Sequence, residues 1–132
     1  MATTTILAAD DDRVVLELLS LGLTARGFKV TVAADGMQAI MVARRVPPDA
    51  ILLDVMMPGG TGFDVLKRLR SNAATAGIPV VAMSASTDPA LPQKVRELGA
   101  NAFLLKPVCL DEVAATLRRV LEKASAAGAL DS

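Results

Sequence analysis

Short apolar segments that alternate with helix-length segments are the feature that most restricts the fold of this 132-residue chain. Five segments have the composition of strands, at residues 4–9, 28–33, 50–54, 80–84 and 102–105. Most of them run almost without a polar residue, which indicates burial on both faces and favours a parallel sheet covered by helices. The chain is therefore predicted to have an α/β fold, a doubly wound five-stranded parallel sheet with helices on both faces.

The connections between these segments have apolar residues at helical spacing. Helices are predicted at residues 14–26, 35–45, 61–70 and 110–121. The connection after residue 84 contains TDPALPQ, in which Pro89 and Pro92 cannot both occupy the first position of one helix. We expect a short or late-starting helix there, preceded by a mobile segment at 85–92.

The size and composition of the chain fit one globular domain, with a core at about residues 4–124 and a flexible tail at 125–132. Its 14 basic and 14 acidic residues balance, so no general field attracts nucleic acid or an anionic membrane. The single cysteine, Cys109, fits a reducing compartment. We therefore expect a cytoplasmic protein that has no direct nucleic-acid partner and no membrane association.

Histidine is absent from the sequence, and this limits the chemistry that the chain can perform. With one cysteine and no imidazole, Ser-His-Asp triads, Cys-His pairs and most zinc sites are excluded. Carboxylates, hydroxyls and lysines remain as the reactive groups.

Polar residues follow four of the five predicted strands: Asp10, Asp11 and Asp12 after the first, Asp54 at the end of the third, Ser84 at the end of the fourth, and Lys106 after the fifth. Sites in parallel α/β sheets form beyond the carboxyl ends of the strands. We therefore expect these side chains to meet at one edge of the sheet.

Carboxylates that meet in this way repel each other unless a cation lies between them. Oxygen ligands with open water positions suit Mg²⁺. A lysine can bind a phosphoryl group and a hydroxyl can donate to one, so the set forms a minimal phosphoryl-transfer site. Asp54, which stands alone on its strand, is the expected nucleophile.

These motifs resemble the receiver domain of two-component response regulators, with similarity from about residue 4 to residue 124. The matching stretches are ILAADDD at 6–12, LLDVMMPGGTG at 52–62, VVAMSAS at 80–86 and FLLKP at 103–107. The resemblance implies the strand order 2-1-3-4-5.

The resemblance also implies roles for three of the acidic residues and for Met56. Asp54 is the phosphorylation site. Asp11 ligates Mg²⁺ directly, Asp10 helps through water, and the backbone carbonyl of Met56 completes the protein's ligands. Thr61, where receivers often have an aspartate, suits the cap of the following helix.

Three further roles follow from the same resemblance. Ser84 bonds a phosphoryl oxygen and moves toward it on activation, where threonine is commoner. Lys106 pairs with the phosphoryl group, and its bond to Pro107 is expected to be cis. Phe103 matches the aromatic switch position.

The function implied is that of a phosphoacceptor which assists its own phosphorylation and dephosphorylation, rather than an enzyme. Its expected partners are a sensor histidine kinase or histidine phosphotransfer protein and a downstream protein effector. Phosphorylation would switch the surface of the fourth helix, fifth strand and fifth helix. No output domain is expected after Leu121, so the role of relay or effector stays open.

Other interpretations exist for the same residues. The fold could serve as a non-phosphorylated interaction scaffold. A Mg²⁺-dependent hydrolase is disfavoured, because Val-Met-Met follows Asp54 and provides no second acid. Taken singly, Asp12 is expected to be a helix cap and Phe103 a core residue. Met56 is a candidate shield of the phosphoryl group against water.

Overall fold

The computed structural model describes residues 3–57 and 62–131, with side chains described as far as residue 126. Strands and helices alternate along the whole chain. They are β1 (Thr5–Ala9), α1 (Arg13–Thr24), β2 (Lys29–Ala33), α2 (Gly36–Arg45), β3 (Ala50–Asp54), α3 (Gly62–Ser71), β4 (Val80–Ser84), α4 (Leu91–Glu97), β5 (Ala102–Leu105) and α5 (Leu110–Asp131).

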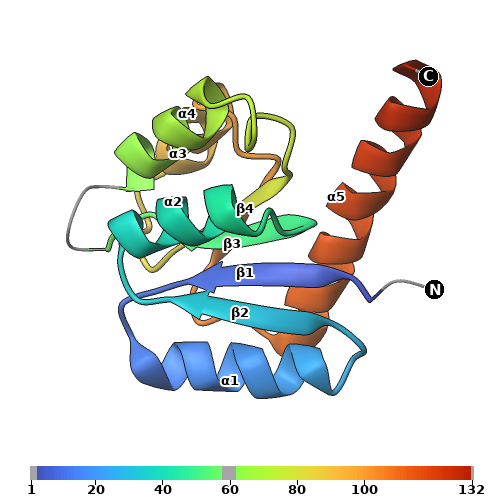
Figure 1. Cartoon of the computed structure of the whole chain (residues 1–132). Coiled ribbons are helices and arrows are strands. Elements are labelled where there is room, and N and C mark those ends of the chain that lie inside the picture. Colours follow the sequence, from blue (N-terminus) through green and yellow to red (C-terminus); the bar gives the residue numbers. More distant parts are fainter. Residues whose placement is uncertain (1–2, 58–61, 132) are drawn as a thin grey trace.

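All five strands are parallel and form one sheet in the order β2-β1-β3-β4-β5 (Figure 1). The predicted α/β fold and its strand order are therefore confirmed. The register places Asp54 beside Met83, and it places Ser84 beside Leu105. The carboxyl ends of these strands consequently meet at one edge.

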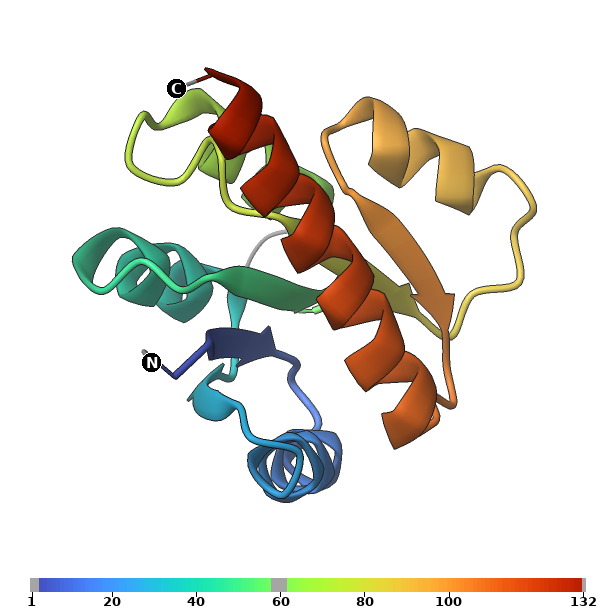
Figure 2. The same ribbon diagram turned by 90° about the vertical axis from the view of Figure 1, so that its right-hand side faces the viewer.

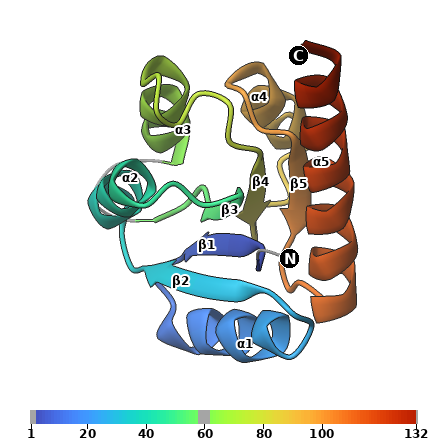
Figure 3. The ribbon, with the colours of Figure 1, turned by 45° about the vertical axis from the view of Figure 1, so that its right-hand side comes forward.

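Two apolar cores cover the two faces of the sheet. In β3, Ile51 and Leu53 point into one core, whereas Ala50 and Leu52 point into the other. Helices α2, α3 and α4 cover the first face, and α1 and α5 cover the second (Figure 3). This arrangement explains why the central strands carry almost no polar residue before their last position.

Helix α4 is short and begins only at Leu91, as the two prolines predicted. The mobility of the segment at 85–92 stays a prediction. Helix α5 continues to Asp131, past the end expected at residue 121, and the tail expected at 125–132 also stays a prediction. Thr61, the expected cap of α3, lies outside the described residues.

In the described ranges, 3–57 and 62–131, no helix has the length and hydropathy that crossing a bilayer requires.

Candidate functional site

Asp54 lies at the last position of the fully buried strand β3, and only 4% of the residue is exposed. The backbone N–H of Met56 donates to its Oδ1 at 2.9 Å. The next residue, Val55, follows the end of β3 and donates its N–H to the carbonyl of Met83 on β4. The carboxylate is thus buried and hydrogen-bonded at the point where the strand leaves the core.

Three carboxylates converge at this edge. Asp10 is completely buried, Asp11 is exposed, and oxygens of Asp10, Asp11 and Asp54 all lie within 4.8 Å of one another. A set of carboxylate oxygens with one exposed member suits a hard divalent cation that keeps some of its water ligands. The donor set therefore fits Mg²⁺.

Lys106 follows β5 and reaches into the acidic cluster. Its Nζ donates to Oδ2 of Asp10 at 2.6 Å and to Oδ2 of Asp54 at 3.0 Å. Its bond to Pro107 is cis, as the resemblance implied. Burial alone would lower the pKa of Lys106, but the hydrogen bonds to the two carboxylates and their charges raise it above its ordinary value.

The pKa of Asp10 is raised as well, and for a carboxyl group this shift disfavours the charged form. Burial raises the pKa of Asp10 above its ordinary value, and the neighbouring charge of Asp54 adds to this effect. Hydrogen bonds from Lys106 and from the backbone N–H of Asp12 offset only part of it. The site therefore has a deficit of positive charge that a divalent cation would fill.

Ser84 is completely buried at the end of β4, one position beyond the neighbour of Asp54 in the register. Its Oγ accepts the N–H of Ser86 at 3.0 Å, and its carbonyl accepts the N–H of Lys106 at 2.8 Å. Phe103 on β5 is partly buried and packs against the core beneath α2, α3 and α4.

Asp12 is the N-cap of α1, as expected, and its Oδ1 accepts the N–H groups of Val14 at 2.9 Å and Val15 at 3.4 Å. Met56 is 63% exposed. Its role as shield, and that of its carbonyl as metal ligand, stay predictions.

Two features of the site were missed in the sequence. The direct bond between Lys106 and Asp10 was not expected, because Lys106 was assigned to the phosphoryl group. The spacing of Ser84, Ser86 and Asp88 is the second feature. Each accepts the N–H two residues further on, and alternating Ser and Asp residues are a signal for such turns.

An apolar groove of about 620 Å³ opens beside Lys106. It is lined by Asp12, Val15, Leu18, Leu19, Ala85, Lys106, Pro107, Val108 and Leu110. Leu18 on α1 is 57% exposed, and Val14 and Leu21 on the same helix are each 65% exposed. The acidic cluster is thus bordered by an exposed apolar surface.

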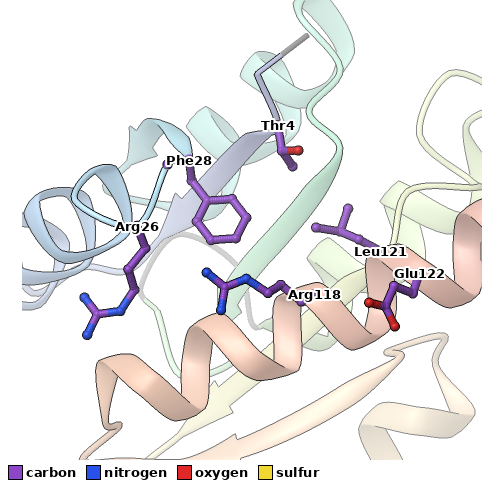
Figure 4. A pocket seen from close by; sticks show the side chains of 7 residues that line it. Thr4, Arg26, Phe28, Arg118, Leu121 and Glu122 are labelled. Atoms are coloured by element: carbon purple, nitrogen blue, oxygen red, sulfur yellow. The ribbon is translucent and has the colours of Figure 1, made fainter. Parts of the chain in front are cut away.

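A smaller pocket of about 320 Å³ lies between the end of α1, the start of β2 and α5 (Figure 4). Cζ of Arg118 lies 5.7 Å from the centroid of the Phe28 ring. The guanidinium of Arg26 instead bonds Asp111 at 2.7 Å. None of the polar residues at the strand ends lines this pocket.

Comparison with known proteins gives one consistent result. Residues 6–118 match the family described as "Response regulator receiver domain". The probable transcriptional regulatory protein TcrX of Mycobacterium tuberculosis is 38% identical over 121 residues, which are 90% of this chain and 50% of TcrX. The DNA-binding response regulator MtrA of Mycolicibacterium paratuberculosis is 38% identical over 118 residues, 89% of this chain and 51% of MtrA.

Among solved structures, the chemotaxis response regulator CheY4 of Vibrio cholerae is similar, with a TM-score of 0.85 and 32% identity over 90% of this chain and 99% of CheY4. A putative response regulator from Chloroflexus aurantiacus has a TM-score of 0.87 and 33% identity over 92% of this chain and 99% of its own.

The expectation that this protein has no direct nucleic-acid partner is contradicted by its relatives. MtrA is by name a DNA-binding response regulator, and this chain spans about half the length of the curated relatives it matches. The balanced charge of 132 residues says nothing about the part of those relatives that the match leaves out.

Proposed function

This chain belongs to the response regulator receiver domain family, and on that premise we propose that Asp54 accepts a phosphoryl group from a phosphohistidine of a partner protein. Receiver domains are regulatory rather than classical enzymes. One observation carries the proposal: Asp54 shares its site with Asp10, Asp11 and the ammonium group of Lys106.

The proposed transfer makes one bond and breaks one. An Oδ atom of Asp54 forms a bond to phosphorus while the P–N bond of the phosphohistidine breaks, and the imidazole leaves with the bonding electrons and takes up a proton. Lys106, 3.0 Å from Oδ2 of Asp54, is placed to bind a phosphoryl oxygen as negative charge collects there.

Asp10, Asp11 and Asp54 would hold Mg²⁺, with the carbonyl of Met56 as a further ligand. A bound Mg²⁺ supplies positive charge to the phosphoryl oxygens and offsets the repulsion between the carboxylates. The phosphoryl group is later lost by hydrolysis of the phosphoaspartate. For this reaction a water molecule must reach phosphorus past residues such as Met56.

Ser84 and Lys106 would bind the oxygens of the phosphoaspartate, and their movement would change the surface of the protein. The hydroxyl of Ser84 turns toward a phosphoryl oxygen, and Phe103 repacks on β5. These shifts bias an equilibrium between two arrangements of α4, β5 and α5, which is the surface proposed to bind partners.

The groove beside Lys106 supports a protein donor. Leu18 and Val14 expose apolar side chains on α1, and the lining of the groove includes Lys106, which bonds Asp54. A helix that carries a phosphohistidine and has an apolar face could bury this surface while its imidazole faces Asp54.

Intact-mass measurement after incubation with acetyl phosphate and Mg²⁺ tests the proposal. The expected result is a gain of one phosphoryl group in the wild type and in Asp35→Asn, a control at the half-buried N-cap of α2, and no gain in Asp54→Asn. Omission of Mg²⁺ in the presence of EDTA should prevent the gain. An unmodified wild type would favour the alternative, a non-phosphorylated scaffold with a receiver fold.

Control of DNA binding is a second candidate output, because the relatives named MtrA are DNA-binding response regulators. Electrophoretic mobility of double-stranded DNA with this chain, before and after acetyl phosphate, tests it. A shift would place the contact within these residues, and its absence would leave phosphorelay or a protein effector as the output of this chain.

A further inference from the structure

Basic residues are concentrated on one face of the protein, although the chain as a whole is neutral. Helices α2, α3 and α4 contain seven basic and two acidic residues, which are Arg44, Arg45, Lys67, Arg68, Arg70, Lys94 and Arg96, with Asp64 and Glu97. Helices α1 and α5, which cover the other face (Figure 2), contain four basic and five acidic residues. The balanced charge of the sequence therefore does not exclude a positively charged face.

Six of these seven basic residues are exposed, and together they are called the basic face: Arg44, Arg45, Lys67, Arg68, Lys94 and Arg96. Among the described side chains, none of the six forms an ion pair with a carboxylate. Arg70 differs, because it is half-buried and its guanidinium donates to the carbonyls of Ile78 and Gly99, each at 2.7 Å. The six exposed cations are therefore open to an anionic partner.

The positive charge continues across the three helices. Arg68 on α3 reaches α2, where its Nη1 lies 3.9 Å from Sδ of Met37. Lys94 on α4 reaches α3, where its Nζ lies 4.4 Å from the centroid of the Phe63 ring. Cationic side chains thus cross both boundaries between these helices, which lie next to one another in Figures 1 and 3. An elongated partner can therefore contact all three helices at once.

The basic face lies away from the acidic cluster. Because all strands are parallel, each helix runs back toward the amino ends of the strands, and its last turn lies at the edge opposite Asp54. Arg44 and Arg45 are in the last turn of α2, and Arg68 is in the last turn of α3. A polyanion can therefore approach these residues without meeting the carboxylates at the other edge.

The helix dipole explains only part of this distribution. It favours a cation in the last turn of any helix. The last turns described for α1 and α5 carry no basic residue, however, and Lys67 precedes the last turn of α3. The concentration of charge on α2, α3 and α4 therefore points to a partner as well as to helix stability.

The chemistry of the basic face suits a phosphate backbone. Four of its six residues are arginines, whose planar guanidinium binds phosphate with paired hydrogen bonds. Packed helices lie about 8–10 Å apart, so three of them extend over about 20 Å. A DNA duplex has one negative charge per about 1.7 Å, which gives roughly a dozen charges over that length. A membrane surface fits less well, because Phe63 is half-buried under Lys94 and offers no exposed aromatic anchor.

We propose that the basic face binds the phosphate backbone of double-stranded DNA. Phosphate contacts carry no sequence information, so the binding is independent of base sequence. The inference rests on the second candidate output of the proposed function, contact with DNA, and assigns that contact to three helices. It does not depend on phosphorylation of Asp54, which lies at the other edge of the sheet.

Fluorescence anisotropy of a labelled duplex of about 20 base pairs, titrated with the unphosphorylated chain in EDTA, tests the inference. Six phosphate contacts limit the slope of log K against log salt to about −5, so the affinity should fall steeply between about 50 and 200 mM NaCl. A wild type that leaves the anisotropy unchanged at about 50 mM NaCl and about 100 μM protein would overturn the inference.

Arg44→Gln/Arg45→Gln removes two charges from the basic face. The salt slope should become less steep by about two, and binding at about 50 mM NaCl should weaken about tenfold. Arg118→Gln/Arg119→Gln is the matched control, because it removes the same charges from adjacent exposed arginines of α5 on the other face. This control should keep the slope and affinity of the wild type. Equal losses in both variants would assign the binding to net charge and reject the basic face.

Arg68→Gln examines a second helix and decides the inference if the first variant does not fold. Its salt slope should become less steep by about one. An unchanged slope would contradict a contact that continues from α2 to α3.

Two further probes separate DNA from other polyanions. Vesicles of phosphatidylserine and phosphatidylcholine represent a membrane surface, and polyglutamate represents an acidic protein. Stronger binding to either probe than to the duplex at the same salt concentration would overturn DNA as the partner. A duplex of shuffled sequence should bind within about twofold of the first, and a larger difference would contradict a backbone contact.

The duplex experiment and the phosphorylation experiment fail separately. Absence of the mass gain after acetyl phosphate counts against Asp54 as phosphoacceptor and leaves the duplex result as it is. A normal mass gain without duplex binding rejects the basic face alone. With Mg²⁺ present in both samples, acetyl phosphate should change the affinity for the duplex by less than about twofold, and a larger change would contradict the independence of the two edges.

Discussion

The ammonium group of Lys106 donates a 2.6 Å hydrogen bond to the completely buried carboxylate of Asp10. Lys106 lies after the last strand, β5, and Asp10 lies after the first, β1. The bond therefore links the carboxyl ends of these two strands across the edge of the sheet that carries the acidic residues. Without a divalent cation, this lysine is the counter-charge nearest to Asp10 and Asp54.

The first prediction concerns the pH dependence of stability in EDTA. Because burial raises the pKa of Asp10 above its ordinary value of 3.8, this carboxyl favours folding while it is protonated, and that contribution is lost as pH rises through the raised pKa. Asp10→Asn should therefore be more stable than the wild type at neutral pH, by about 1 kcal/mol. Urea unfolding between acidic and neutral pH measures the difference.

The difference between Asp10→Asn and the wild type should shrink toward zero at acidic pH. Asp35→Asn, which replaces one good cap by another at the N-terminal end of α2, should show no gain of this size. A less stable Asp10→Asn at neutral pH would mean that the ion pair with Lys106 outweighs the burial of the carboxylate.

A second prediction follows from the close approach of Gly62 to Val55. A Cβ at Gly62 would lie 2.8 Å from the carbonyl carbon of Val55, so backbone must move. Gly62→Ala should cost about 3 kcal/mol of unfolding free energy. At Gly77 a Cβ would meet nothing within 4 Å, so Gly77→Ala should be neutral or stabilising by up to about 1 kcal/mol in the same urea experiment. Similar values for both variants would contradict the packing argument.

Much of the site could be predicted because it depends on topology. The alternation of strands and helices places Asp10, Asp54 and Lys106 at one edge of a parallel sheet whatever the details of packing. Which oxygen Lys106 bonds could not be predicted, since that choice depends on ångström-scale geometry and on the balance between burial and charge.

The structural roles of Arg70 and Gly62 could not be predicted from the sequence. Arg70 has the surroundings of an ordinary solvated arginine at the end of a helix, and its partners are backbone carbonyls, which no residue type reveals. Gly62 follows a glycine-rich stretch, and the sequence does not show which of those glycines is required by a close contact.

A third prediction concerns how long the phosphoryl group persists. Met56 lies two residues after Asp54, and an amide in its place could orient a water molecule toward phosphorus. Met56→Asn should therefore lose phosphate several-fold faster than the wild type, as measured by intact mass after removal of acetyl phosphate. Met41→Asn, on the exposed face of α2, controls for a general effect of the substitution. An unchanged or slower loss from Met56→Asn would reject the shielding role.

The last prediction separates a protein donor from a small one. Leu18→Glu places a charge in the apolar groove beside Lys106 without removing a buried side chain, so the fold should be retained. Phosphotransfer from a sensor histidine kinase that phosphorylates the wild type should slow by about tenfold, which corresponds to about 1.4 kcal/mol of lost docking energy. Phosphorylation by acetyl phosphate should be unaffected, because that donor needs only the site around Asp54.

Met41→Glu is the control, because Met41 is exposed on α2, which covers the other face of the sheet. This variant should be phosphorylated by both donors at the rate of the wild type. An equal loss with both donors would assign Leu18 to the integrity of the site, and no loss with the kinase would place the docking surface elsewhere.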